Sequence, residues 1–402
     1  MSTPSFQPKL ARRSQNLQAS FIREILKITA QKDVISFAGG LPNPAFFPVD
    51  AIKDATAKVL SADGPNVLQY TVTEGYRPLK EFIANRYAEK NGVQLTPEEI
   101  LITNGSQQGM DLIGKLMLNP GDELLVEDPS FIGAIQAFGI FEPTFVPVLL
   151  EQDGMNTEAL EQMLRQTNAN LCYTVPNYQN PTGFTYSKEK REAIARLLQQ
   201  HEVLMVEDNP YGEINFTGRQ YPSFQSLYPE GTLLMGSFSK TVSPGMRMGW
   251  ITAPVDLMEK LVIIKQAADT HSNYFAQRVL HQYLSDNDLD LHIAGITEAY
   301  QLQCKTMVSA IEQYFPEAVK VSVPDGGMFI WGELPVHLDA RDFFQRAIQR
   351  KVAFVPAQAF YAQGNVKHTF RLNFSNTVPE LIEEGIQRLG DCLKELLSGQ
   401  KN

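Results

Sequence analysis

The sequence predicts an α/β protein whose large domain has a doubly wound, mainly parallel sheet, followed by a smaller α+β domain. Three observations carry this prediction. The chain has 402 residues, of which 43% are hydrophobic, which is enough for more than one core. Its middle alternates short apolar runs with helical patterns, and several runs are apolar on both faces, as expected for strands covered by helices on each side. After about Leu284 this alternation stops.

The large domain is predicted over residues 46–284. Helical patterns lie between its strands, for example at residues 107–118 and 188–200. Such strand–helix alternation is typical of parallel strands joined by crossover helices. The candidate strands lie at residues 100–103, 123–127, 145–148, 171–175, 203–207, 233–236 and 249–252.

The rest of the chain is predicted to form a small α+β domain over residues 285–402 and an N-terminal arm over residues 1–45. The arm contains one amphipathic helical pattern at 17–28, which we expect to pack with the small domain near the functional site. The small domain begins with a long helical pattern. Its segments are a helix at 289–314, strands at 319–323 and 328–333, a helix at 340–350, a strand at 369–374 and a helix at 379–397.

Composition excludes several classes of partner. The net charge of −10 argues against binding to nucleic acid or to an anionic membrane, and no uncharged apolar stretch is long enough to span a bilayer. Six scattered histidines without paired spacing predict no metal site. The three cysteines, Cys172, Cys304 and Cys392, form no Cys-x-x-Cys pair, which favours reduced thiols in a cytoplasmic protein.

The segment 237–249, directly after the apolar run 233–236, is the most informative part of the chain. It contains Ser237, Ser239, Lys240 and, seven residues further on, Arg247. The two hydroxyls and the guanidinium can converge on one anion, because arginine gives bidentate phosphate contacts and serine hydroxyls donate as well. A lysine amine beside a bound phosphate ester is what a Schiff-base cofactor requires. Ser-x-Ser-Lys alone would indicate only a polar loop.

Residues 103–108 form a second candidate anion site, between a predicted strand and a predicted helix. Gly105 permits a tight turn, and the backbone N–H groups of Ser106 and Gln107 stand at the helix N-terminus, where phosphate binds readily. The alternative, that Ser106 is only an N-cap, explains this segment equally well by itself.

Two polar side chains follow other predicted strands. Asn180, in Asn-Pro-Thr-Gly, lies after the strand at 171–175, and Asp208 directly follows the strand at 203–207. Ligands of open α/β sheets bind at these carboxyl ends. An acidic group there is costly if it is buried without a partner, and a pyridinium N–H would be such a partner. The alternatives are an ordinary turn at Asn180 and a helix cap at Asp208.

Taken together, these segments resemble the fold-type I, class I/II aminotransferases that depend on pyridoxal 5'-phosphate (PLP), from about Ser20 to the C-terminus. Residues 20–24 and 36–42 are most similar to the branch that contains the 2-aminoadipate and kynurenine aminotransferases. The motifs that carry the resemblance occur in the family's order: Gly-Gly-Leu-Pro, Gly-Ser-Gln, Asn-Pro-Thr-Gly, Asp-x-x-Tyr, Ser-x-Ser-Lys followed by Pro-Gly-x-Arg-x-Gly, and Phe-Arg-Leu-Asn-Phe-Ser at residues 370–375.

The resemblance implies a role for each motif residue. Lys240 holds PLP as a Schiff base and later moves the proton, while Asp208 pairs with the pyridine nitrogen. Asn180 and Tyr211 hold the cofactor's 3'-oxygen, and the aromatic ring of Phe131 stacks on the cofactor, where many relatives have Tyr or Trp. The phosphate ligands are Ser106, Gln107, Ser237, Ser239 and Arg247.

The resemblance also implies the substrates and the assembly. An L-amino acid of the 2-aminoadipate, glutamate, aromatic or branched-chain class exchanges its amino group with a 2-oxo acid by a ping-pong mechanism. Arg371 binds the α-carboxylate with help from Asn180, beside Gly40. Tyr70 reaches the phosphate from a partner subunit, which makes the protein a homodimer with shared active sites.

Alternatives to these assignments stay open at two points. Arg23 either meets the distal carboxylate of an acidic substrate or lies on the solvated face of its helix. The same scaffold also hosts C–S lyases, decarboxylases and cyclopropane-forming synthases, although Arg371 with the Gly39-Gly40 segment favours transamination. Related transcription regulators carry a winged helix before this fold, and we expect none here because 35 residues precede Ser36.

Overall fold

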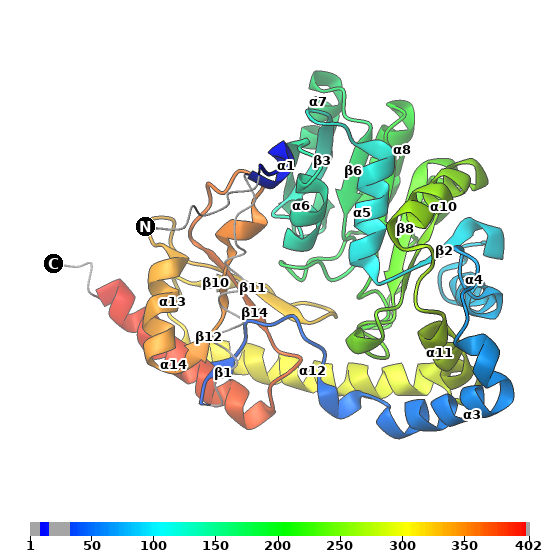
Figure 1. Ribbon diagram of the computed structural model, residues 1–402. Helices are drawn as coiled ribbons and strands as arrows, with labels where there is room; N and C mark the ends of the chain where they lie inside the picture. Colours follow the sequence, from blue (N-terminus) through cyan, green and yellow to red (C-terminus); the bar gives the residue numbers. More distant parts are fainter. Residues whose placement is uncertain (1–8, 16–32, 399–402) are drawn as a thin grey trace, which may run out of the picture.

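A computed structural model describes residues 9–15 and 33–398, and in it a long helix joins a larger sheet to a smaller one (Figure 1). The larger sheet has eight strands, and its central strands β4, β3, β6, β7 and β8 are parallel. Strand β9 is antiparallel to both of its neighbours. The order across the sheet is β2 (Ile100–Thr103), β9 (Gly249–Thr252), β8 (Thr232–Ser237), β7 (Leu204–Asp208), β6 (Leu171–Thr174), β3 (Glu123–Asp128), β4 (Thr144–Glu151) and β5 (Gly154–Met155).

Helices cover both faces of this sheet because successive strand residues point to opposite sides. In β3, Leu124 and Val126 join the core under one set of helices, whereas Leu125 joins the core under the other. The first set is α5 (Ser106–Met117), α6 (Ile132–Gly139) and α10 (Val255–Asp269); the second is α7 (Thr157–Gln166), α8 (Lys188–Gln200) and α9 (Phe224–Leu227).

A third core lies at the β2 end of the sheet. There Ile102, Leu234 and Trp250 pack against three helices that were not predicted from the sequence. These are α3 (Val49–Val67), α4 (Arg77–Asn91) and α11 (Tyr274–Asp286). The 26-residue helix α12 (Leu289–Tyr314) then runs along the lower edge of the molecule to the smaller sheet (Figure 1).

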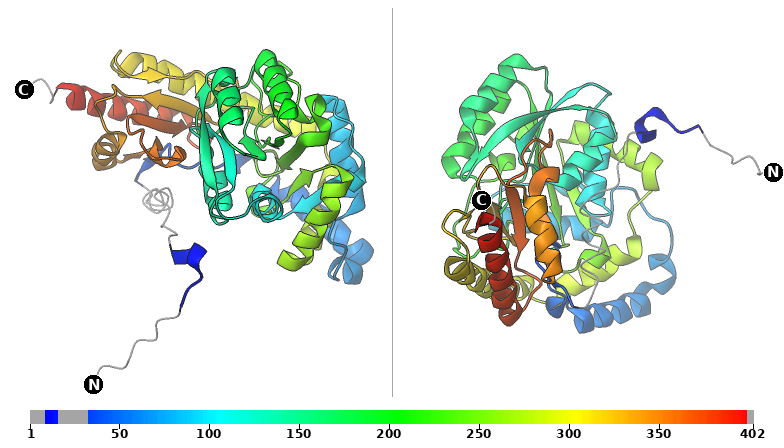
Figure 2. Two further views of the ribbon diagram at one scale, coloured as in Figure 1. Left: turned by 90° about the horizontal axis from the view of Figure 1, so that it is seen from above. Right: turned by 90° about the vertical axis from the view of Figure 1, so that its left-hand side faces the viewer.

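The smaller sheet is antiparallel and is covered by helices, with the C-terminal helix on its outer side (Figure 2). Its strands, in order, are β10 (Lys320–Val321), β11 (Phe329–Glu333), β14 (Thr369–Asn373) and β13 (Val355–Pro356). The covering helices are α13 (Ala340–Gln349) and α14 (Pro379–Ser398). A separate two-stranded pairing joins β1 (Ile35–Ser36) to β12 (Val352–Ala353).

The pairing of β1 with β12 fixes the position of the residues that follow β1. The backbone N–H of Phe37 donates to the carbonyl of Ala353, and the N–H of Asn373 donates to the carbonyl of Phe37. The residues that follow are therefore held beside the small sheet.

The remaining short elements are α1 (Arg12–Gln15), η1 (Pro44–Phe46), η2 (Pro97–Glu99), η3 (Pro229–Gly231), η4 (Pro244–Met246) and η5 (Ala357–Phe360).

The predicted fold class is confirmed, and each of the seven strands predicted for the large sheet is present with ends that differ by up to three residues. The helix predicted at 17–28 lies outside the described residues. Short strands such as β5 were not predicted because two residues carry no periodic pattern. Within the described part of the chain, no helix combines the length and hydropathy needed to cross a membrane.

Candidate active site

A cavity of about 310 Å³ opens at the carboxyl ends of the parallel strands. This edge is where ligands bind in open α/β sheets, because the loops of several strands meet there. The predicted site residues line the cavity, with the exception of Tyr70 and Arg23. Those that line it are Gly40, Ser106, Gln107, Phe131, Asn180, Asp208, Tyr211, Ser237, Ser239, Lys240, Arg247 and Arg371.

Lys240 projects into the cavity from the loop after β8. Its Nζ donates to the carbonyl oxygen of Gly40 at 2.9 Å and lies 5.8 Å from the ring centre of Tyr211. Burial lowers the pKa of Lys240 to about 8, and the nearby guanidinium groups of Arg371 and Arg247 act in the same direction. Near neutral pH, a fraction of this amine is therefore free to act as nucleophile or base.

Asp208 ends strand β7 and is 2% exposed. Its Oδ2 accepts a hydrogen bond from the Tyr173 hydroxyl at 2.8 Å, whereas its Oδ1 has no hydrogen-bond partner among the described residues. Burial raises the pKa of Asp208 to about 7, although the bond from Tyr173 lowers it in part. A buried carboxylate oxygen without a donor is costly, so this atom suits a ligand N–H.

Arg371, on β14, brings a buried positive charge to the cavity. Its Nη1 donates to Asn180 Oδ1 at 2.7 Å and its Nη2 to the carbonyl of Ala38 at 2.5 Å. Its guanidinium also lies over the rings of Phe329 and Phe360, at 4.5 and 5.2 Å from their centres. Burial lowers the pKa of Arg371 to about 10, so it stays charged, and no described carboxylate bonds to it. An anionic ligand would supply the missing counter-charge.

Helix α5 begins at the rim of the cavity with a turn that leaves no room for a side chain. Gly105 has φ +77°, and a Cβ at this position would lie 2.6 Å from Arg247 Nη2. The hydroxyl of Ser237 donates to that of Ser239 at 2.8 Å, and both residues line the same cavity. Ser106 is the first residue of α5. Backbone N–H groups, hydroxyls and a guanidinium therefore converge, as a phosphate group requires.

An ion pair between the buried Lys265 and the partly exposed Asp269 holds this turn in place. Asp269 accepts hydrogen bonds from Asn104 Nδ2 at 2.8 Å, from Gln108 Nε2 at 2.7 Å and from Lys265 Nζ at 2.5 Å. The Lys265 side chain is fully buried. Because Asn104 and Gln108 stand on either side of Gly105 and Ser106, the carboxylate of Asp269 positions the start of α5.

Aromatic side chains form the walls of the cavity. Phe131 immediately precedes α6, and a Cβ at Gly133 would lie 2.5 Å from its ring. Gln107 Nε2 donates to the carbonyl of Gly133 at 3.0 Å, which ties α5 to this loop. The ring of Tyr211 packs edge-on against Phe329, and burial raises the pKa of Tyr211, so its hydroxyl stays protonated.

Two predicted site residues do not line the cavity. Tyr70, on the segment after α3, is 83% exposed, and its ring packs edge-on against His271. Arg23 lies outside the described residues. The structure of one chain therefore brings together the residues of the strand-end motifs and leaves Tyr70 on the surface.

The sequence profile of the family described as "Aminotransferase class I and II" matches residues 32–389. The chain belongs to this family. The matched range contains every residue of the described site, from Gly40 to Arg371.

Relatives of this aminotransferase match it over almost its whole length. Aromatic-amino-acid aminotransferase 1 of Thermococcus litoralis is 39% identical over 98% of this chain and 96% of its own. A kynurenine aminotransferase of Pyrococcus horikoshii, solved with PMP, is 38% identical with a TM-score of 0.93, over 96% of this chain and 97% of that one. The α-aminoadipate aminotransferase of Thermus thermophilus, complexed with N-(5'-phosphopyridoxyl)-L-leucine, is 38% identical with a TM-score of 0.90, over 97% and 98%.

Some residues of the aminotransferase site were not anticipated from the sequence. Tyr173 lies inside an apolar strand, where a tyrosine is usually a core residue, and only the parallel register of β6 with β7 brings it to Asp208. Phe329, on β11, and Phe360, in η5, reach the guanidinium of Arg371 only through the packing of the small sheet and its neighbouring turn. Asp269 had one local signal: a carboxylate in the last turn of a helix is unfavourable unless it has partners.

Proposed function

We propose that this aminotransferase binds PLP in the cavity and transfers the amino group of an L-amino acid to a 2-oxo acid in two half-reactions. The observation that carries the proposal is the unpartnered, buried Oδ1 of Asp208 in the same cavity as Lys240. A pyridinium N–H would supply the missing donor. The resulting ion pair would favour the charged carboxylate and so oppose the effect of burial, which raises the pKa of Asp208.

The other lining residues fit the remaining parts of PLP. Asn180 and Tyr211 would hold the 3'-oxygen, and Phe131 would cover one face of the ring. When bound, PLP supplies a carbonyl carbon that condenses with amines and a ring that accepts the electron pair of the substrate's Cα–H bond. The residues that would hold the phosphate are Ser106, Gln107, Ser237, Ser239 and Arg247.

The substrate would be oriented by the charge of Arg371. Its guanidinium, with the Asn180 side chain, would bind the α-carboxylate beside the backbone of Gly40, and this places Cα near Lys240. Because burial lowers the pKa of Lys240, its amine can accept the Cα proton and later return it. The Asp208 carboxylate would keep the ring nitrogen protonated during this transfer.

The proposed amino donors are 2-aminoadipate, glutamate, and aromatic or branched-chain amino acids. The names of the relatives, which are aromatic, kynurenine and α-aminoadipate aminotransferases, support this range. Arg23 is proposed to meet the distal carboxylate of acidic donors. The structure of residues 16–32 is not described, so this assignment rests on the family resemblance.

We also propose a homodimer in which Tyr70 completes the partner's site. Leu68, Tyr70 and Val72 are 69, 83 and 60% exposed, and such an exposed apolar stretch is typical of an interface. Residues 1–45, 46–284 and 285–402 are proposed to act as the arm, the large domain and the small domain. Cys172, Cys304 and Cys392 are free and buried, which supports a cytoplasmic enzyme.

A half-reaction screen tests the function and its substrate class. Single amino acids are added to the PLP-loaded protein, and the visible absorbance of the cofactor is followed while the products are identified. Conversion of the cofactor to its amine form with release of a 2-oxo acid supports transamination. Release of ammonia, sulfide or carbon dioxide without that conversion would instead identify a lyase or decarboxylase and overturn the proposal.

A further inference from the structure

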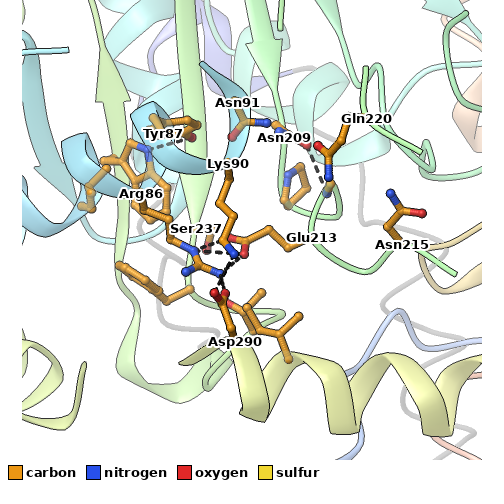
Figure 3. Close-up of a pocket in the computed structure, with 17 residues that line it drawn as sticks. Arg86, Tyr87, Lys90, Asn91, Asn209, Glu213, Asn215, Gln220, Ser237 and Asp290 are labelled. Carbon is orange, nitrogen blue, oxygen red and sulfur yellow. Dashed lines mark hydrogen bonds and ion pairs between the residues drawn. The ribbon is translucent and has the colours of Figure 1, made fainter. Parts of the chain in front are cut away.

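A second cavity, of about 210 Å³, lies between α4, the N-terminal end of α12 and the segment that follows β7 (Figure 3). We call it the α4–α12 cavity. It shares Ser237 and Pro210 with the cofactor cavity, but it contains neither Lys240 nor Asp208. The role of the aminotransferase site therefore does not account for it.

One wall of the α4–α12 cavity is apolar and rigid. Tyr87, Phe238 and Trp250 line it, and each is less than 9% exposed. Trp250 Nε1 donates to the Tyr87 hydroxyl at 3.1 Å, and the rings of Phe238 and Trp250 lie 4.9 Å apart. Such a wall suits an apolar or aromatic group.

Four charged side chains also line the cavity, and Figure 3 shows them converging. Arg86 Nε donates to both carboxylate oxygens of Glu213 at 3.0 Å, and Nη2 donates to Glu213 and, at 2.8 Å, to Asp290. Lys90 Nζ donates to the second oxygen of Asp290 at 2.5 Å. Each of the four carboxylate oxygens thus has a donor.

The two cationic side chains keep further donors. Arg86 Nη1 and the remaining hydrogens of Lys90 Nζ have no acceptor among the described residues. The side-chain amides of Asn91 and Gln220 also line the cavity without a partner among those residues, so each offers both donors and an acceptor. The free cationic donors favour a ligand that brings acceptor oxygens, and a carboxylate is the strongest such acceptor.

We propose that the α4–α12 cavity binds a small monocarboxylate with an apolar or aromatic body. The carboxylate meets Arg86 and Lys90, and the body lies against Phe238 and Trp250. The volume agrees with this ligand, because an apolar cavity of about 150 Å³ accommodates benzene and the observed 210 Å³ leaves room for a carboxylate.

The position of this cavity couples it to the cofactor cavity. Phe238 and Thr241 line the α4–α12 cavity, and they flank Ser239 and Lys240 in the chain. A ligand that shifts this loop changes the surroundings of Lys240. We therefore expect occupancy to alter the visible absorbance of the bound cofactor and to lower kcat, so that carboxylates of the substrate and product class regulate the enzyme.

Calorimetric titration of the PLP-loaded protein with 3-phenylpropionate tests the binding. The Arg371→Ala variant removes the carboxylate-binding group of the main site, so binding that persists reports on the second cavity. Adding Lys90→Gln should weaken this binding about tenfold, the effect of one charge-assisted hydrogen bond. The neutral analogue 3-phenylpropanamide should bind at least as weakly, because it lacks the charge.

Lys115→Gln is the matched control. Lys115 is 39% exposed and bonds to Asp111 at 2.6 Å, while Lys90 is 40% exposed and bonds to Asp290 at 2.5 Å. Unchanged affinity in Lys115→Gln with weakened affinity in Lys90→Gln supports the proposal. No binding in Arg371→Ala, or binding that ignores Lys90→Gln, overturns it. Calorimetry does not depend on catalysis, so failure of the proposed function would be seen separately.

Inhibition kinetics of the wild type provide a second measurement in case Arg371→Ala does not fold. At the main site 3-phenylpropionate competes with the amino donor and raises KM, whereas in the α4–α12 cavity it lowers kcat. Lys90→Gln should remove the effect on kcat and leave the effect on KM. Purely competitive inhibition of the wild type would contradict the proposal.

Discussion

The two cavities that meet at Ser237 differ in how their buried polar groups are satisfied. In the cofactor cavity, Asp208 Oδ1 and Arg371 Nε lack hydrogen-bond partners among the described residues. In the α4–α12 cavity, each oxygen of the Glu213 and Asp290 carboxylates accepts a hydrogen bond, while Arg86 Nη1 has no acceptor among the described residues. The difference indicates that the first cavity is incomplete without a bound group, whereas the second is a stable surface that can take a ligand.

A second pair of buried groups sharpens this distinction. Burial raises the pKa of both Asp208 and Glu127 to about 7. Glu127, however, accepts hydrogen bonds from the side chains of Gln179, Thr174 and Tyr186 and lies outside the cavity. An elevated pKa alone therefore does not identify a catalytic group. The missing hydrogen-bond partner and the access to the cavity are what support the role proposed for Asp208.

The largest expected effect follows from removing the amine of the cofactor cavity. Lys240→Ala should lower kcat by roughly 10³-fold or more, because the nucleophile and the base disappear together. The phosphate contacts should still retain PLP, and borohydride should no longer attach it covalently. Steady-state kinetics and mass spectrometry check these results, with Lys115→Ala as a control. Normal turnover by Lys240→Ala would refute the assignment.

The unpaired carboxylate should also make the cofactor-free protein sensitive to pH. Burial raises the pKa of Asp208 from 3.8 to about 7, so its protonated form stabilises the fold below pH 4 and this contribution is lost as the pH rises through 7. That difference corresponds to about 4 kcal/mol. Urea unfolding should therefore show that Asp208→Asn loses less stability than the wild type between pH 4 and 7. Bound PLP should abolish this difference between the wild type and Asp208→Asn. If the two proteins lost stability equally over this pH range without PLP, the prediction would be contradicted.

Asp208→Asn should impair catalysis even though it leaves the fold in place. A neutral amide cannot keep the ring nitrogen protonated, so we expect a loss of about 3–4 kcal/mol in barrier stabilisation, or roughly 10²–10³-fold in kcat. Glu127→Gln is the control, since Glu127 has partners of its own and should change stability more than kcat. Equal kcat for Asp208→Asn and the wild type would exclude the proposed pairing.

A smaller effect should come from changing Asp269, which positions the start of α5 and so the proposed phosphate ligands. Asp269→Asn keeps the shape of the side chain but weakens its bonds to Asn104, Gln108 and Lys265. We expect PLP to dissociate about tenfold faster, the effect of about 1.4 kcal/mol, with a smaller change in kcat at saturating PLP. Stopped-flow dilution measures the rate. A merely structural Asp269 would lower the unfolding midpoint without changing PLP release.

Much of the main site could be predicted because its residues follow strands with strong local patterns. Parallel strands end at one edge of a sheet, so Ser106, Asn180, Asp208 and Lys240 could be placed together once the strands were recognised. Glycine, hydroxyl and lysine residues at these ends also form motifs of short range. The sequence by itself therefore determined the fold class and the strand-end part of the cavity.

Only the tertiary structure decided which distant residues complete the two cavities. Arg371 meets Asn180 across 191 positions because β14 of the small sheet packs beside the large one, and Tyr173 meets Asp208 through the register of β6 with β7. Arg86 and Asp290, 204 positions apart, meet because α4 lies beside α12. Local sequence patterns indicate the hydrophobic periodicity and the ends of each helix or strand. A contact between two elements depends instead on the packing of all the side chains that lie between them.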